Sequence, residues 1–384
     1  MNNDALSTAE RTALSAADAF AANYLAPNAQ TWERDRAAPR EMFEKAGAVG
    51  LLGLLVPQDQ GGAGVSYVAL LRILEVLAKA DMAAAFALIV HNNHVRGIAA
   101  SGSEHLTSSY LADMIAGRTV GAFLLTEPKG GSDAAAITTT AIEDGDSYVL
   151  NGAKAWISNT PTADLLNVFA QTQPGAKAGG ILSIQVPADA PGVTRLPAYE
   201  MMGSYAIGAG GFEFKDVRVP KRQLMLPAGQ GFKAAMAGID IARAGVAAMC
   251  AGMLRAGLDT AMPRLLTREA FGGVLADQQG LMWTLADVAT ELEATRLMAY
   301  NAAAEIDRNG KAVEAAAHAK KFATRAAFKG LNACMQAMGA DGLKQDHPLA
   351  RHLAAAKMAE YLDGTTEIQN VVISRSLRKA YAQG

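Results

Sequence analysis

Residues 125–159 read LTEPKGGSDAAAITTTAIEDGDSYVLNGAKAWISN, and this stretch decides how the chain folds. The run Glu-Pro-Lys-Gly-Gly-Ser that follows Thr126 cannot form regular secondary structure, and its glycines let the backbone approach a flat or anionic ligand closely. Further along, β-branched residues flank Asp144-Gly145, and a second such dipeptide, Asn151-Gly152, follows. Asp-Gly and Asn-Gly favour tight turns because they tolerate positive φ, so both dipeptides predict turns with strands on either side.

The pattern of apolar residues divides the chain into three parts. Residues 1–118 and 223–384 carry the apolar periodicity of helices. Residues 119–222 instead hold short β-branched or aromatic runs separated by turns, which favours a small β-barrel or sandwich over a βαβ sheet. In the last of these runs the apolar residues change parity near Lys215-Asp216, which predicts a β-bulge there. The sequence therefore predicts an α+β protein with an N-terminal helical domain, a middle β domain and a C-terminal helical domain.

Composition excludes several classes of function. Of the 384 residues, 51% are apolar and 19% are charged, as in soluble globular proteins, and the net charge of −2 offers no basic surface for nucleic acid. Cys250 and Cys334 lack the spacing of a redox or zinc motif and are expected to be buried thiols, and the six histidines show no metal-ligand spacing. The N-terminus resembles neither a signal peptide nor a transit peptide, and no apolar run reaches membrane-spanning length, so we expect a cytoplasmic protein.

The two clusters at the ends of residues 125–159 resemble the flavin-binding middle domain of the acyl-CoA dehydrogenases. That family carries a Thr-Glu-Pro-x-x-Gly-Ser-Asp loop and a Trp-Ile-Thr/Ser strand beside the isoalloxazine ring, and both occur here in the same order. By their chemistry alone, Thr126 and Ser158 supply hydroxyls for the flavin edge and Trp156 supplies an apolar wall. Taken singly, Trp156 would be interpreted as a core residue and Ser158 as a turn residue. The resemblance implies FAD contacts from Phe123, Leu125, Thr126, Trp156, Ile157 and Ser158.

Further clusters in the C-terminal half extend the resemblance over nearly the whole chain and imply a C-terminal four-helix bundle. Residues 268–272, REAFG, resemble an element whose Arg reaches the flavin pyrophosphate of a neighbouring subunit, which implies a homotetramer. A guanidinium suits bidentate phosphate binding, and the alternative is an exposed Arg in a helix–helix turn. Residues 336–342, QAMGADG, resemble the loop that holds the ADP part of FAD, although Ala340 replaces a glycine. The cofactor contacts implied in this half are Arg268, Phe271, Gln279, Gln336, Gly339, Thr365 and Glu367.

The last cluster, YLDGTTEIQ at residues 361–369, resembles the family segment Tyr-Glu-Gly-Thr-x-x-Ile-Gln, whose Glu removes the substrate α-proton. Asp363 occupies that position, with its carboxylate set back by one C–C bond, about 1.5 Å. The shorter side chain requires a closer substrate or leaves room for a bulkier α-carbon. Some relatives carry the base just before an Arg that corresponds to Arg243, but Ala242 stands there in this chain. The alternative interpretation of Asp363 is an Asx turn that ends a helix before Gly364.

The resemblance implies FAD-dependent α,β-dehydrogenation of an acyl-CoA thioester, with an electron-transfer flavoprotein as the acceptor. Asp363 beside Leu362 favours branched, cyclic or otherwise unusual acyl groups, carried by CoA or by an acyl-carrier protein. Flavin monooxygenases and desulfinases of this fold usually lack a carboxylate here, and nitroalkane oxidases pair their Asp with an Arg where this chain has Asn370. A helical assembly protein without activity is the non-enzymatic alternative. The substrate contacts implied are Ser132, Asp240, Arg243 and Gly364.

Overall fold

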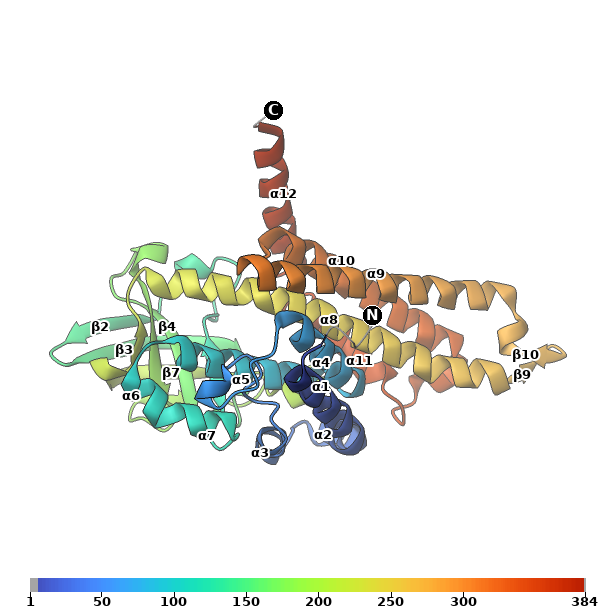
Figure 1. Ribbon diagram of the computed structural model, residues 1–384, viewed down its shortest axis with the longest axis horizontal. Coiled ribbons are helices and arrows are strands. Elements are labelled where there is room, and N and C mark those ends of the chain that lie inside the picture. Colours follow the sequence, from blue (N-terminus) through green and yellow to red (C-terminus); the bar gives the residue numbers. More distant parts are fainter. Residues whose placement is uncertain (1–5, 383–384) are drawn as a thin grey trace.

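A computed structural model describes residues 6–382, which form a helical domain, a β domain and a second helical domain in chain order (Figure 1). The first helix begins where the sequence carries a capping box, because Ser7 and Glu10 exchange side-chain and backbone hydrogen bonds. The N-terminal helices are α1 (Thr8–Phe20), α2 (Ala26–Asp35), α3 (Glu41–Ala48), α4 (Tyr67–Ala80), α5 (Met82–Ala100), α6 (Glu104–Leu106) and α7 (Ala112–Ile115).

The middle domain is built on a mostly antiparallel sheet, as expected from strands that follow one another without intervening helices. Its strands lie in the order β6-β7-β3-β2-β4-β5-β8, and β1 pairs with β4 in parallel. The apolar faces of these strands enclose a core of their own, which includes the fully buried Phe212 and Leu166. The strands are β1 (Gly121–Leu124), β2 (Thr140–Asp144), β3 (Ser147–Ile157), β4 (Leu165–Gln171), β5 (Ile181–Pro187), β6 (Val193–Arg195), β7 (Gly210–Pro220) and β8 (Leu224–Leu226).

The two dipeptides expected to form turns behave differently. Asp144-Gly145 does end β2 and starts the tight turn into β3, with Gly145 at φ 60°. The turn predicted at Asn151-Gly152 is wrong, since both residues lie inside β3, where Gly152 has φ 144°. The bulge predicted near Lys215-Asp216 explains why, because the β3–β7 register shifts there and Asn151 exchanges two hydrogen bonds with Asp216. Asn151-Gly152 therefore bends a strand and does not end one.

The C-terminal domain is organised around one long core helix. α8 (Gln230–Thr267) packs along α4, α9 and α10, and close approach to α4 requires Gly252, where a Cβ would lie 2.3 Å from the Glu75 carbonyl oxygen. Gly310 ends α9 as its C-cap, with φ 70°, a conformation that glycine adopts without strain. The remaining elements are β9 (Glu269–Ala270), β10 (Gly273–Val274), α9 (Gln279–Asn309), α10 (Val313–Ala337), α11 (Leu349–Ala359) and α12 (Thr366–Ala382).

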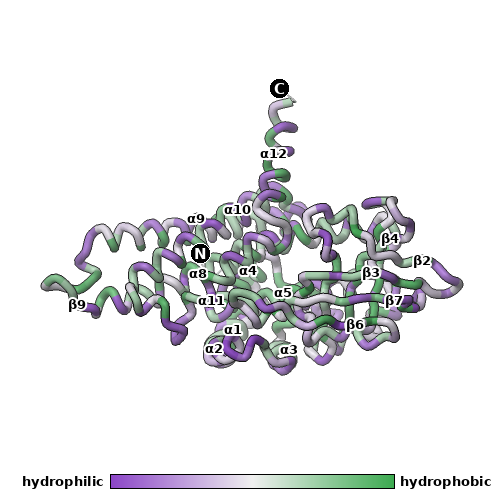
Figure 2. Tube along the Cα trace, turned by 180° about the vertical axis from the view of Figure 1, so that it is seen from behind, coloured by the Kyte–Doolittle hydropathy of each residue, from purple (hydrophilic) through white to green (hydrophobic). Residues whose placement is uncertain are grey.

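The molecule is elongated, and its β domain and its β9–β10 hairpin lie far apart. The β domain lies at one end of the long axis, and the β9–β10 hairpin lies at the opposite end, beyond the long helices (Figure 1). α12 projects away from the rest of the molecule and carries both hydrophilic and hydrophobic residues along its length (Figure 2). Cys250 and Cys334 are both buried in the helical core as free thiols, as expected.

Candidate active site

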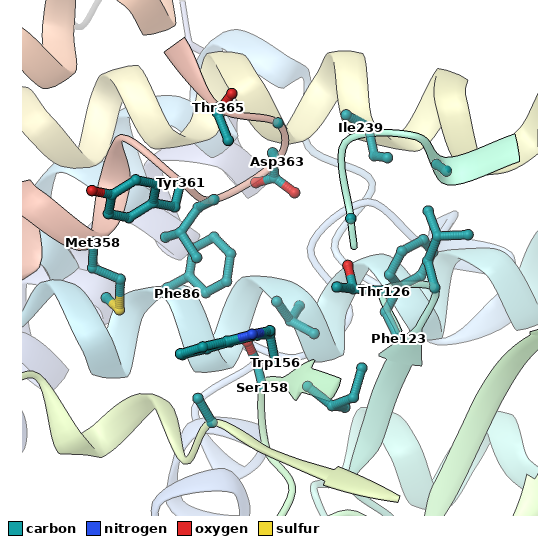
Figure 3. A pocket seen from close by; sticks show the side chains of 18 of the residues that line it. Phe86, Phe123, Thr126, Trp156, Ser158, Ile239, Met358, Tyr361, Asp363 and Thr365 are labelled. Carbon is teal, nitrogen blue, oxygen red and sulfur yellow. The ribbon is translucent and has the colours of Figure 1, made fainter. Parts of the chain in front are cut away.

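A cavity of about 600 Å³ lies where the β domain meets α5, α8 and the turn before α12. Figure 3 shows the carboxylate of Asp363 on one side of this space and the ring of Trp156 on the other, with Thr126 and Phe123 beside them. The cavity thus brings together segments that lie far apart in the sequence. The residues of the sequence prediction that line it are Phe123, Leu125, Thr126, Ser132, Trp156, Ile157, Ser158, Arg243, Asp363, Gly364 and Thr365.

Trp156 is an exposed wall of the cavity and not the core residue of the alternative interpretation. Its side chain is 64% exposed, and its backbone adopts a left-handed conformation with φ 59°. A large aromatic residue seldom takes that conformation, so the surrounding strand must hold it in place. The ring of Tyr199 packs against the indole of Trp156, with the ring centroids 4.6 Å apart. A wide, exposed aromatic face at the edge of a cavity, with the hydroxyls of Thr126 and Ser158 nearby, fits a flat flavin ring.

A buried ion pair holds the loop that carries Thr126 in place. Lys154 is fully buried, and its Nζ lies 3.0 Å from both Glu127 Oε1 and the Leu125 carbonyl oxygen. Glu127 also accepts hydrogen bonds from the backbone N–H groups of Thr138 and Thr139. Burial would raise the pKa of Glu127, but Lys154 and these donors lower it to about 2. Because this network ties the loop to β3, it sets the position of Thr126 relative to Trp156.

Asp363 lines the cavity and has an unusual backbone conformation. Asp363 and Gly364 have φ 51° and 91°, and Arg243 Nε donates to the Asp363 carbonyl oxygen at 3.1 Å. The Asp363 carboxylate accepts no hydrogen bond from residues 6–382, and its Oδ2 is shielded from solvent. The Asx turn, which needs such a bond, is therefore absent. Burial raises the pKa of Asp363 to about 6, against the opposing charges of Lys320 and Arg243.

The predicted thioester contacts occupy different environments. Ser132 and Gly364 line the cavity, and Ser132 is exposed. Arg243 also lines it but is buried and already engaged, since its Nη1 lies 2.7 Å from Asp240 Oδ1 and its Nε bonds the Asp363 backbone. Asp240 does not line the cavity, and burial raises the pKa of its carboxyl group. In this structure, Arg243 therefore supports the turn that carries Asp363.

A second group of predicted cofactor residues lies far from the cavity. Arg268 follows the C-terminal end of α8, Phe271 at the tip of the β9–β10 hairpin is 96% exposed, and Gln279 starts α9. Gln336 and Gly339 are held near this end, because Arg264 on the last turn of α8 bonds the Met338 carbonyl oxygen and pairs with Asp341. Helix α8 from Ile239, in the cavity, to Thr267 is about 42 Å long at 1.5 Å per residue. Glu367 is exposed in the first turn of α12 and does not line the cavity.

The structure also adds residues that the sequence interpretation did not single out. Lys320 on α10 is buried next to the Asp363 turn, and its sequence signal was a lysine within the apolar, alanine-rich stripe of a helix. A second cavity of about 300 Å³ adjoins the first and shares Phe86, Phe123 and Asp363 with it. Leucine side chains of α4 are among the residues that line it, so an apolar chain extending from the Asp363 site can be accommodated there.

Comparisons with known proteins agree along the whole chain. Models of the acyl-CoA dehydrogenase N-terminal, middle and C-terminal domains match residues 7–118, 122–217 and 229–378. The chain is 36% identical over 363 residues to a short-chain specific acyl-CoA dehydrogenase of Mus musculus, which covers 94% of this chain and 88% of that protein.

Solved structures give the same result. Butyryl-CoA dehydrogenase from Megasphaera elsdenii matches with a TM-score of 0.93 and 30% identity over 98% of this chain and all of the other. A glutaryl-CoA dehydrogenase from Mycobacterium smegmatis, solved with FADH2, matches with a TM-score of 0.91 and 28% identity over 97% and 95%. The sequence models, the curated relative and the solved structures agree, and so this chain belongs to the acyl-CoA dehydrogenase family.

Proposed function

We propose that the Asp363 carboxylate is the base in the FAD-dependent α,β-dehydrogenation of an acyl-CoA that this protein carries out. The observation that carries the proposal is a carboxylate that faces Trp156 across the cavity, accepts no hydrogen bond from the described chain and has its Oδ2 shielded from solvent. A base must be free to accept a proton from the substrate, and a pKa near 6 leaves it ionised at neutral pH while keeping it basic.

Residues on opposite walls of the cavity have different roles in the reaction. Trp156, with the hydroxyls of Thr126 and Ser158, would hold the ring of FAD, which would supply the acceptor for the hydride from the substrate β-carbon. The Asp363 carboxylate lies on the side of the cavity opposite Trp156, from which it would take the α-proton of an acyl chain held between them. The backbone N–H of Asp363 donates to no group within residues 6–382, so it is free to polarise the thioester carbonyl as the negative charge develops. Phe86 and Ile239 exclude water from the space between.

Two features support an acyl group that is branched or cyclic near the α-carbon. Asp363 is shorter than Glu by one C–C bond, about 1.5 Å, which widens the space above the acyl chain. The second cavity of about 300 Å³ adjoins the first at Phe86, Val90 and Ile239, so the combined space exceeds that of the first cavity alone. The relatives named for short-chain and butyryl substrates make a short acyl group the natural starting point for this chain.

The direct test is flavin reduction by a panel of substrates. We expect the purified protein to be yellow, with one FAD per chain, and to bleach under anaerobic conditions with acyl-CoAs. Straight, branched and cyclic acyl-CoAs of equal carbon number should differ in the rate of bleaching, and the bulky ones should react fastest. A protein that cannot be loaded with FAD would contradict the proposed function. Equal rates across the panel would contradict only the preference for bulky acyl groups.

We propose a homotetramer in which one chain completes the FAD site of another. The distance along α8 supports this arrangement, because about 42 Å of helix separates the cavity from Arg268 and the Gln336 loop. Phe271 at the hairpin tip, and Leu377 and Tyr381 on the projecting α12, are exposed apolar side chains that contact with another chain would cover.

Replacing Arg268 with Ala should weaken FAD binding without unfolding the protein. The side chain is exposed within one chain, so its loss removes a phosphate contact and not a packing contact. FAD retained after gel filtration and the circular dichroism spectrum would measure the two effects, with Arg308→Ala at the end of α9 as an exposed control. Tight FAD binding by a monomer, seen by sedimentation, would show that Arg268 does not act across a subunit interface.

We further propose that the protein works in the cytoplasm and passes its electrons to an electron-transfer flavoprotein. Two buried, unpaired thiols suit a reducing compartment. Within residues 6–382, one helix, α8, is long and apolar enough to cross a membrane, but 61% of the relevant stretch is buried inside the protein, as for a core helix. Fractionation of the source cells and a dye-reduction assay with purified acceptor test the two statements separately.

A further inference from the structure

Lys320 is a charged side chain in the interior of the C-terminal helical domain. Only 1% of it is exposed, and its neighbours along the inner face of α10 are small residues such as Ala316 and Ala323. Lysine is seldom buried to this extent without a partner, because desolvation of the ammonium group is costly. Burial lowers the pKa of Lys320 to about 8, and Asp363 is the strongest influence opposing that shift, so Lys320 keeps its proton at neutral pH.

The ammonium group binds the backbone on both sides of Asp363. Lys320 Nζ donates to the Gly364 carbonyl oxygen at 2.7 Å and to the Glu360 carbonyl oxygen at 3.3 Å. Consecutive left-handed residues at Asp363 and Gly364 interrupt helical hydrogen bonding, so the carbonyl groups of this turn need donors from elsewhere. Lys320 comes from α10, whereas the turn joins α11 to α12, and the contact therefore ties the turn to the helical bundle.

Two cations, Arg243 and Lys320, lie near Asp363, and they differ in whether another carboxylate already pairs with them. Arg243 also faces Asp363, but its guanidinium pairs with Asp240 at 2.7 Å. Lys320 makes no ion pair within 4 Å in the part of the chain that the structure describes. The ionisable groups that influence Lys320 from the elements around it are Asp363, Cys250, Arg243, Glu360 and Glu367. Cys250 stays neutral because burial raises its pKa to about 12.

We propose that Lys320 is a positioning residue for the base: it holds the turn that presents Asp363, and its charge keeps the Asp363 carboxylate ionised. The proposal rests on the proposed role of Asp363 and goes beyond it, because it assigns the protonation state of the base to a residue that does not line the cavity. A buried carboxylate without hydrogen bonds would otherwise hold its proton at neutral pH.

The test is the pH profile of anaerobic flavin reduction in FAD-loaded variants. Lys320→Gln removes the charge and keeps a hydrogen-bond donor near Gly364, whereas Lys320→Met removes both. An opposite charge at close range lowers the pKa of a carboxyl group by about 1–3, so both variants should shift the acid limb of the profile upward by about that amount. Lys320→Gln should regain near-native rates at high pH, Lys320→Met should stay slower, and Lys320→Arg should restore the native limb.

Controls separate this role from plain stability. Lys321→Met changes the adjacent lysine on the outer face of α10, beside Phe322 and Arg325, and should leave the profile unchanged. An unchanged acid limb in folded, FAD-loaded Lys320→Gln would overturn the proposal, and so would unfolding of every variant that removes the charge. If Asp363→Asn also kept near-native rates, the fault would lie with the assignment of the base. If Asp363→Asn reduced its flavin slowly but the acid limb of Lys320→Gln did not shift, Asp363 would remain the base and the role proposed for Lys320 would be wrong.

Discussion

Replacing Asp363 with Asn lowers the rate of flavin reduction by at least about two orders of magnitude, the low end of what a general base contributes. The amide has nearly the same size as the carboxyl group but cannot accept the α-proton. FAD content and ligand binding should change little, because the carboxylate accepts no hydrogen bond from the described chain that the amide could lose. Stopped-flow flavin bleaching with the best substrate measures the effect.

The pH dependence gives the same substitution a second readout. The pKa of Asp363 is raised to about 6 in the folded protein, so native flavin reduction should fall as the pH drops through 6 and the base becomes protonated. The Asp363→Asn variant has no such limb. Asp346→Asn changes an exposed carboxylate in the loop before α11, at the end of α8 that carries Arg264 and far from the cavity, and should behave as the native protein. Near-native bleaching by Asp363→Asn would place the base elsewhere.

Asp363→Glu separates the chemistry of the base from the space around it. A longer side chain should preserve or improve the reaction of straight acyl-CoAs and slow that of branched or cyclic ones. The left-handed backbone at Asp363 adds a complication, because Asp tolerates φ 51° better than Glu does. FAD content and thermal stability of the variant must therefore be measured beside its rates. An unchanged ranking of substrates would leave Asp363 as the base and remove the argument for a bulky acyl group.

Replacing Lys154 with Met is expected to lower the free energy of unfolding by about 3–5 kcal/mol, the cost of leaving one partner of a buried ion pair uncompensated. Glu127 would keep its charge in a site shielded from water, with only backbone and hydroxyl donors remaining. Because the pair anchors the loop that carries Thr126, FAD should be released before the β domain unfolds. Urea titrations followed by tryptophan and flavin fluorescence measure both events.

Two further variants show whether burial of the ion pair is responsible. Lys221→Met breaks an ion pair with Glu143 on the exposed surface of the same domain and should lower the stability far less than Lys154→Met does, because solvent screens this pair. The double replacement of Lys154 by Met and Glu127 by Leu removes both charges and should recover much of the lost stability, because no unpaired charge stays buried. Equal losses for Lys154→Met and Lys221→Met would contradict this account.

The order of helices and strands followed from local patterns, because periodicity and capping act within a few residues. The capping residues Ser7 and Gly310 act on the helix ends beside them, and the bulge at Lys215-Asp216 was visible in the sequence as a change of parity. The turn predicted at Asn151-Gly152 was wrong because that prediction also used only local sequence. As a dipeptide it favours a turn, but pairing with the bulged strand β7 holds it inside β3, and that partner lies about 65 residues away in the sequence.

The sequence by itself determined which residues could do the chemistry, since Trp156, Thr126 and Asp363 stand in recognisable clusters. Only the tertiary structure decided how they act. It exposes Trp156 as a wall, it leaves the Asp363 carboxylate without a hydrogen bond from the described chain, and it places Arg268 at the far end of α8. It also buries Lys320 beside Asp363 and Lys154 beside Glu127. Burial and charge pairing depend on segments that meet only after folding, so one-dimensional patterns do not contain them.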